Sequence, residues 1–354
     1  MLLIINKLKN ADVYLLPLAI FFILISSAGT NIFILLAVLF SLIHCIYKKN
    51  YQILFEKNFL KTCFLIYFLF LISSLYSISN FEEVISSLKK YIKFLYIPFI
   101  YYIVKIHKNE KLIINFFIFG STIILALSYL KYFNIFNFDS FYEFLKNTNI
   151  ANPKDKIIIN KTSVFQNYIV HGVVFSFYSF LCFYLAKKNN SLLYYSLALL
   201  SFVNVLFLND SRTGYIIILI LAVFTFFQLI SSNKIRLSIL LIFGSIFFTQ
   251  FTDNLLNRVN ALSSDLYFID KNNYNTSLGY RYIWTKVGVD NLAKKPLFGF
   301  GAGSYEKTSV RYYKDNNVND YNSYITNNPH NEFISISTQL GLVGLSLFFI
   351  FLYN

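Results

Sequence analysis

The sequence predicts an all-α polytopic membrane protein, with about ten transmembrane helices and a large, partly helical periplasmic loop before the last of them. Composition indicates the class first: 56% of the 354 residues are hydrophobic and only 14% are charged, whereas soluble domains carry roughly a quarter charged residues. Mean hydropathy is +0.54. The apolar residues also form runs long enough to cross roughly 30 Å of hydrocarbon.

Ten such runs predict the spans, and only the fourth is interrupted, by Lys93 and Pro98. The first run does not read as a cleavable signal peptide, because a second span follows at once without a small-residue cleavage site. The spans lie near residues 12–28, 31–47, 62–79, 91–106, 112–130, 168–186, 191–208, 213–230, 237–252 and 333–353.

Cations on alternate loops predict the orientation. With the N-terminus in the cytoplasm, every second loop is rich in lysine, while short opposite loops such as Ser27–Thr30 are nearly bare. This positive-inside pattern predicts that 131–167 and 253–332 lie on the outer face, which is the periplasmic face of the inner (cytoplasmic) membrane if the cell is a Gram-negative bacterium. The cytoplasmic cations are Lys7, Lys9, Lys48, Lys49, Lys57, Lys61, Lys105, Lys108, Lys111, Lys187, Lys188, Lys234 and Arg236, and the outer loop at 80–90 is mixed, with Glu82, Glu83, Lys89 and Lys90.

This topology divides the chain into three regions. They are a transmembrane bundle at 1–252 with nine spans and the outer loop 131–167, a large periplasmic loop at 253–332, and a last span at 333–354. A bilayer protein has no folding reason to build so large a polar insert, and functional sites concentrate on loops held by a scaffold. We therefore expect the functional residues in or beside this loop.

Charge and cysteine usage exclude several classes of partner and site. The net charge of +14 needs no nucleic acid, because much of it is topogenic lysine and the rest suits anionic membrane lipids. Cys45, Cys63 and Cys182 lie in or beside spans, so no outer-face disulfide is expected among them. The four histidines have no cysteine or second histidine at ligand spacing, so no metal site is predicted.

Arginine is rare in this lysine-rich chain, which suggests that its planar, bidentate binding of phosphate oxygens is needed where it was kept. Arg212 opens a predicted span, where Ser211 or Thr213 can cap the helix and free N–H groups can bind an anion. The alternative, that Arg212 pairs with Asp210 or reaches lipid phosphate, is equally compatible with the local sequence. The arginines on the outer side are Arg212, Arg258, Arg281 and Arg311, and the second and last of these are typical of solvated loop cations.

Arg281 lies in a segment, Gly279–Val287, that is predicted to form an amphipathic helix with Tyr280, Trp284 and Val287 on one face. Trp284 is the only tryptophan, and its ring suits a membrane interface. An interfacial helix with a solvated arginine explains the segment equally well without a site.

Pro296–Ser304 is a glycine-rich turn, in which Gly301 and Gly303 can take positive φ and present N–H groups to an anion. No Gly-Lys-Ser/Thr follows, so it is not a P-loop. A plain tight turn is the alternative.

His330 stands at the head of the last span. A histidine there can accept a proton from a hydroxyl, and Glu332 either orients its ring or is a solvated acid at a helix start. Its interest comes from the two arginines and the glycine turn on the same face. His171 is a weaker candidate, because it can simply bond a neighbouring helix.

Four motifs in order resemble the O-antigen ligase/polymerase superfamily, over roughly 200–354 by motif and over the whole chain by hydropathy. They are Ser211-Arg212-Thr213-Gly214, Arg281-x-x-Trp284, Pro296-Leu297-Phe298-Gly299-Phe300-Gly301, and His330-Asn331 followed by Gly341-Leu342-Val343-Gly344.

The resemblance implies a C-type membrane glycosyltransferase that takes a glycan from undecaprenyl diphosphate. Its acceptor would be a hydroxyl of the outer saccharide of lipid A–core for a ligase, another carrier-bound repeat for a polymerase, or a protein for an O-oligosaccharyltransferase. It also implies an inverting reaction without metal, nucleotide or other cofactor, and the sequence has no Asp-x-Asp motif. Such proteins usually continue with two spans beyond the loop, whereas this sequence has one; its ending is either truncated or different.

By similarity, His330 is the catalytic base, and Arg212 and Arg281 hold the donor diphosphate together with Gly301 and Gly303. The supporting residues would be Ser211, His171, Trp284, Asn331 and Glu332. The Arg-Thr-Gly and His-Asn motifs favour the ligase branch.

Two other classes remain open. A polysaccharide or lipid transporter would show ionisable residues or broken helices at the membrane midplane, whereas most predicted spans have uncharged middles. An outer-face receptor or scaffold would suit the loop, which is rich in tyrosine and asparagine.

Overall fold

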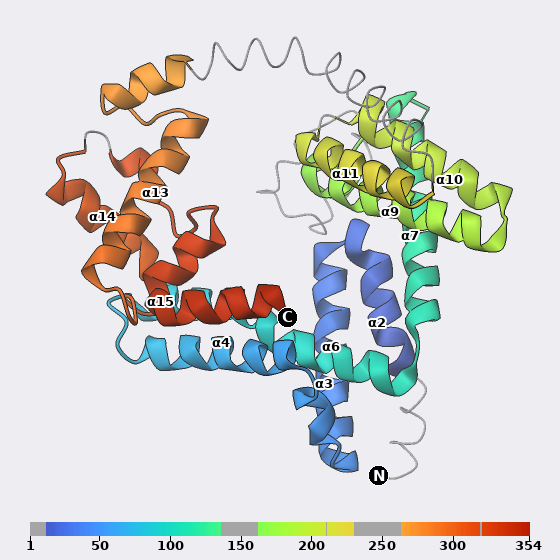
Figure 1. The fold of residues 1–354 in the computed structure, drawn as a ribbon, viewed down its shortest axis with the longest axis horizontal. Coiled ribbons are helices and arrows are strands. Elements are labelled where there is room, and N and C mark those ends of the chain that lie inside the picture. The colour runs from blue at the N-terminus through green and yellow to red at the C-terminus, as the bar shows by residue number, and fades with distance from the viewer. Residues whose placement is uncertain (1–11, 136–161, 210, 230–262, 319–320) are drawn as a thin grey trace, which may run out of the picture. The chain divides into compact units, whose positions relative to one another are not determined.

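The computed structural model describes residues 12–135, 162–209, 211–229, 263–318 and 321–354, and in these ranges the chain is helical with no strand (Figure 1). The predicted span at 237–252 lies outside the described residues. The helices are α2 (Asp12–Phe21), α3 (Ser27–Lys48), α4 (Asn58–Ser74), α5 (Phe81–Tyr91), α6 (Lys93–His107), α7 (Glu110–Tyr132), α9 (Tyr168–Asn189), α10 (Leu192–Val203), α11 (Arg212–Leu229), α13 (Ser277–Lys294), α14 (Tyr305–Asp315) and α15 (Glu332–Tyr353).

The predicted all-α membrane class is confirmed. In the described ranges four helices, α3, α7, α9 and α15, are long and apolar enough to cross a bilayer. Shorter apolar helices occupy Val13–Leu24, Asn58–Ser74, Leu192–Leu208 and Thr213–Thr225, which coincide with other predicted spans. The count of ten spans and their sidedness stay predictions.

Two local expectations differ from the structure. Ser27–Thr30, expected as a bare loop, forms the first turn of α3. The region 80–90, expected as a mixed loop, forms the helix α5, whereas α6 at Lys93–His107 coincides with the run predicted at 91–106. Asn80 and Glu83 form a reciprocal capping box at the start of α5, which satisfies N–H groups that a helix start leaves free.

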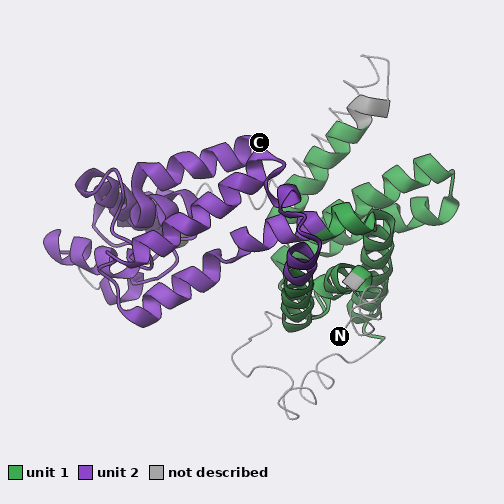
Figure 2. Cartoon of the chain, turned by 90° about the horizontal axis from the view of Figure 1, so that it is seen from below, with its two compact units in different colours: residues 1–40, 103–248 green, residues 41–102, 249–354 purple. Residues whose placement is uncertain are grey.

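The chain forms two compact units, each built from two separate stretches (Figure 2). Unit 1 comprises 1–40 and 103–248, and unit 2 comprises 41–102 and 249–354. This division differs from the predicted regions 1–252, 253–332 and 333–354, because 41–102 groups with the last hundred residues. The polar insert and the last span therefore have a helical partner from early in the chain.

In unit 1, α9 packs against both α10 and α11. Small residues permit the close approach of α9 and α11: an added Cβ on Gly172 would lie 2.5 Å from the Cβ of Ser211, and one on Gly214 would lie 2.9 Å from the Cα of Gly172. This contact fixes the first turn of α11, the helix that begins at Arg212.

In unit 2, α15 packs against α4 and α13 (Figure 1). The polar insert has its own buried core, with aromatic residues at its centre. That core comprises Ile269, Tyr274, Ile283, Val287, Tyr305, Tyr313 and Tyr324. Burial of this apolar and aromatic surface gives the insert a fold of its own above α15.

Candidate functional site

The glycine-rich turn is built into a break in α15. Gly341 interrupts the helix with φ 64° and ψ −156°, which leaves carbonyl groups before the break and N–H groups after it without helical partners. The turn supplies those partners: Phe300 N donates to Thr338 O at 2.9 Å, and Leu342 N donates to Pro296 O at 2.7 Å. The broken helix and the turn therefore form one hydrogen-bonded element.

The N–H groups of Gly301 and Gly303, expected to face an anion, donate within the chain instead. Gly301 N bonds to Gln339 O at 3.0 Å, and Gly303 N bonds to Gln339 Oε1 at 2.7 Å. Both glycines have positive φ, as expected. Here the glycines serve close backbone approach, because an added Cβ on Gly301 would lie 2.4 Å from the Cα of Ser77.

His330 is exposed at the end of the polar insert, directly before α15. Its backbone is left-handed, with φ 53°, and its N–H donates to Asn328 Oδ1 at 3.2 Å. Its imidazole lies 5.5 Å from the Trp284 ring, centroid to centroid. The expected base is therefore held by a backbone hydrogen bond to Asn328 and by the contact of its ring with Trp284.

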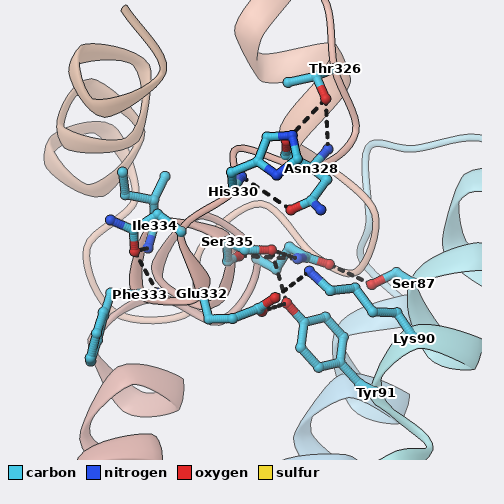
Figure 3. Close-up of polar contacts among 12 residues, drawn as sticks. Ser87, Lys90, Tyr91, Thr326, Asn328, His330, Glu332, Phe333, Ile334 and Ser335 are labelled. Carbon is cyan, nitrogen blue, oxygen red and sulfur yellow. Dashed lines mark hydrogen bonds and ion pairs between the residues drawn. The ribbon is translucent and has the colours of Figure 1, made fainter. Parts of the chain in front are cut away.

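Glu332 does not orient the His330 ring. Its carboxylate lies 2.8 Å from Lys90 Nζ and accepts a 2.8 Å hydrogen bond from the Tyr91 hydroxyl. Figure 3 shows this carboxylate directed toward α5, with His330 on the other side beside Asn328. Glu332 is the acid in the first turn of α15, as one of the two expected roles has it, and its side chain is 47% exposed. It is also bonded to Lys90 and Tyr91, which neither expectation included.

Asn331 caps α15. Its Oδ1 accepts hydrogen bonds from Phe333 N at 3.0 Å and Ile334 N at 3.3 Å, which satisfies two N–H groups at the helix start. Asn331 therefore supports the site through the backbone that follows His330.

The amphipathic helix expected around Arg281 is present as α13. Ile283 and Val287 are buried, Trp284 Nε1 donates to Tyr324 O at 2.9 Å, and the Trp284 ring stacks on Tyr280. Arg281 is exposed one helical turn before Trp284, and residues three apart share a helix face. In unit 2, therefore, Arg281 lies one helical turn from Trp284, and Trp284 contacts the ring of His330.

In unit 1, α11 begins at Arg212, of which the structure describes the backbone and not the side chain. Ser211, rather than Thr213, caps the helix: its Oγ accepts from Gly214 N at 3.1 Å. Asp210, Arg258 and the greater part of the loop 131–167 lie outside the described residues. The joint action of Arg212 with Arg281 and His330 stays a prediction, since the residues belong to different units.

His171, the weaker candidate, lies in the core of unit 1. It is 1% exposed, and its Nε2 lies 3.0 Å from Asn204 Oδ1, while Asn204 Nδ2 donates to Ser128 Oγ at 2.9 Å. An amide oxygen only accepts, so Nε2 carries a proton. The geometry is that of a histidine bonded to a neighbouring helix.

Sequence reasoning missed Lys90, Tyr91, Ser335 and Gln339. Lys90 and Tyr91 are separated from α15 by more than two hundred residues, and their region read as a mixed loop. A signal was nonetheless present, since α5 has a strong amphipathic pattern with an acidic start and a basic end. Among the described residues, no group of three histidines, cysteines or acids could hold a metal ion.

Comparison with known proteins now adds to this geometry. Residues 196–349 match the family model described as O-antigen ligase. The match covers 154 of the 354 residues, so this segment is similar to the O-antigen ligase family. The match includes Arg212, Arg281, the glycine turn and His330, so it confirms the resemblance. Members of that family are glycosyltransferase-like enzymes.

The chain is also similar to an uncharacterised protein of Haemophilus influenzae, with 24% identity over 184 residues, which is 50% of this chain and 46% of that protein. The chain thus matches about half the length of that relative. The similarity adds no activity to the assignment made by the O-antigen ligase segment.

Proposed function

We propose that this protein transfers a glycan from undecaprenyl diphosphate to a hydroxyl of the outer saccharide of lipid A–core, at the periplasmic face of the bacterial inner membrane. The main support is the contact of the exposed His330 with Trp284, which lies one helical turn after Arg281 in α13. All three residues lie in the segment that matches the O-antigen ligase family.

The chemistry needs a base for the acceptor and a cationic site for the leaving group. The bond between the anomeric carbon and the diphosphate oxygen breaks as the acceptor oxygen attacks from the opposite face of the sugar, which inverts the anomeric carbon. The diphosphate leaves with the bonding electron pair, and Arg212 and Arg281 stabilise its added charge. An imidazole nitrogen of His330 takes the acceptor proton.

The surroundings of His330 make this base independent of a carboxylate. The nearest acid in sequence, Glu332, is bonded to Lys90 and Tyr91, so the imidazole is supported by Trp284 and by the backbone around Asn328.

The test uses the full chain in lipid nanodiscs with undecaprenyl-diphosphate-linked glycan and purified lipid A–core. We expect glycan joined to the core, with loss of product in His330→Gln and Arg281→Ala, and wild-type rates in Arg311→Ala. Longer carrier-linked chains without core product would reject the ligase reaction in favour of a polymerase. Glycan moved across the bilayer without any new glycosidic bond would reject enzymatic transfer and favour a transporter.

A further inference from the structure

The first residue of α15 is held by the last two residues of α5. Glu332 contacts Lys90 Nζ and the Tyr91 hydroxyl, each at 2.8 Å. The side chains of Lys90 and Glu332 are 35% and 47% exposed, so solvent weakens their ion pair. Tyr91 is only 4% exposed, which makes its hydroxyl the better-fixed partner.

The Tyr91 hydroxyl also leads into a buried polar network along α15. It lies 2.8 Å from Ser335 Oγ, and Gln339 Nε2 donates to Ser335 O at 3.0 Å. Gln339 Oε1 in turn accepts from Ser87 Oγ at 2.6 Å and from Gly303 N. Ser87 and Tyr91 of α5 and the glycine turn are thus joined through Ser335 and Gln339 of α15. Figure 3 shows Ser87, Tyr91 and Ser335 of this network.

Tyr91 is itself immobilised by packing. Its ring stacks on Phe70 of α4, with centroids 4.0 Å apart and planes at 14°. A hydroxyl on a stacked, buried ring is a fixed point, because moving it would open the core between α4, α5 and α15.

His330 is two residues before Glu332, which accepts a hydrogen bond from the fixed Tyr91 hydroxyl. Asn331 binds the first turn of α15, Glu332 ties that turn to α5, and the left-handed backbone of His330 turns its ring toward Trp284 of α13. The position of the imidazole is therefore determined from both ends: by α13 at the ring and by α5 at the backbone that follows.

We infer that Tyr91 and Lys90 are positioning residues for glycan transfer, acting through Glu332 to hold His330 where it meets the acceptor hydroxyl. This inference rests on the proposed function for the role of His330. It assigns to the end of α5 a part in the reaction, although neither residue needs to touch substrate.

The variants Tyr91→Phe and Glu332→Gln separate positioning from folding. Tyr91→Phe removes one hydroxyl and keeps the stacked ring, and Glu332→Gln keeps the shape and removes the charge. Lys90→Met tests the ion pair, Lys90→Arg is the conservative rescue, and Lys89→Met, which removes the adjacent exposed cation, is the matched control.

Two readouts are measured on each full-length variant in nanodiscs. The first is kcat and KM for the carrier-linked glycan. The second is the fluorescence emission of Trp284, the only tryptophan. It is measured for each variant with and without His330→Ala, and the difference between the two spectra reports the imidazole–indole contact without requiring activity.

We expect Tyr91→Phe and Glu332→Gln to lower kcat on the order of 10-fold to 100-fold, as small misplacements of a reacting group do, with KM unchanged and a smaller emission difference. Lys90→Met should show a weaker form of the same effect, and Lys90→Arg and Lys89→Met should resemble wild type. Wild-type kcat and emission in Tyr91→Phe and Glu332→Gln, even with a lowered Tm, would overturn the inference. If wild type shows no transfer, the proposed function fails. In that case the emission readout still tests the positioning of His330: the same emission difference in Tyr91→Phe and Glu332→Gln as in wild type would overturn it.

Discussion

A Cβ atom on Gly341 would lie 2.3 Å from the carbonyl oxygen of Leu297, so the glycine turn fits the break in α15 only because position 341 has no side chain. The φ and ψ of Gly341, 64° and −156°, also fall in a region that only glycine occupies readily. The glycine at position 341 therefore permits the break in α15, within a run that the sequence predicted as one span.

Gly341→Ala should therefore be severely destabilising. We expect a loss of at least roughly 3 kcal/mol in the free energy of unfolding, since the backbone strain alone costs on the order of 1–3 kcal/mol and the steric overlap adds to it. Thermal unfolding followed by Trp284 emission measures the effect. Gly29→Ala, where the added Cβ meets only the Phe22 ring at 3.2 Å, is the control and should change stability little. Equal Tm values for the two variants would show that the break is not needed.

Arg281→Lys should lower glycan transfer although it keeps the charge. An ammonium cannot form the bidentate contact of a guanidinium with diphosphate oxygens, and loss of one such donor costs on the order of 10²-fold in rate. Arg311→Lys is the matched control, because the Arg311 side chain is 67% exposed and lies 3.9 Å from Asp315. Initial rates at saturating donor decide the matter: similar rates for both variants would assign Arg281 to the solvated surface.

His171→Phe should reduce stability but not the rate of transfer per folded molecule. The substitution leaves Asn204 Oδ1 buried without its partner, at a cost of about 1–3 kcal/mol. His171 is 1% exposed, so it cannot reach a substrate in this structure. A second variant that adds Asn204→Leu should recover part of the loss, and Tm together with the rate per folded molecule checks both. A large fall in kcat without a fall in Tm would contradict this prediction and would indicate that His171 takes part in glycan transfer.

The polar insert should lose stability at alkaline pH. Burial raises the pKa of Tyr305, with a smaller contribution from Tyr313, and burial likewise raises the pKa of Tyr313. Both phenols stay protonated in the folded state, while unfolded tyrosine ionises near pH 10. Stability is therefore fully present below about pH 10 and is lost as pH rises above it toward the folded pKa values.

Trp284 reports this transition because it belongs to the same aromatic cluster. We expect its emission to shift cooperatively above about pH 10, together with the rise in tyrosinate absorbance. Tyr313→Phe should move the transition to higher pH, and Tyr353→Phe, at the exposed end of α15, serves as the control. Gradual ionisation at an unshifted pH with unchanged emission would contradict burial of these phenols.

Much of the helix pattern could be predicted because hydropathy is a local property. The starts and ends of α7, α9 and α15 follow the apolar runs closely, and the cap at Ser211 was among the expected options. The region of α5 was misjudged, because its charged residues Glu82, Glu83, Lys89 and Lys90 indicated a loop when they belong to an amphipathic helix.

The candidate site divides in the same way. His330, Arg281 and the glycine turn could be named from residue type and order, since a base, a guanidinium and positive-φ glycines each have a local signature. The hydrogen-bond partners of those residues have no such local signature. Gly301 and Gly303 were expected to bind an anion through their N–H groups, but in the structure these groups already donate to Gln339.

Composition and apolar run length were enough to predict a helical membrane protein, and the order of four short motifs was enough to predict the similarity to O-antigen ligases that residues 196–349 show, because none of these features needs three-dimensional information. The hydrogen bond between Glu332 and Tyr91, 241 positions apart, and the hydrogen bonds of the glycine turn to the break in α15 came from the three-dimensional structure alone. Such contacts depend on which helices pack together, and packing brings distant parts of the chain within hydrogen-bond reach without leaving a local mark on either of them.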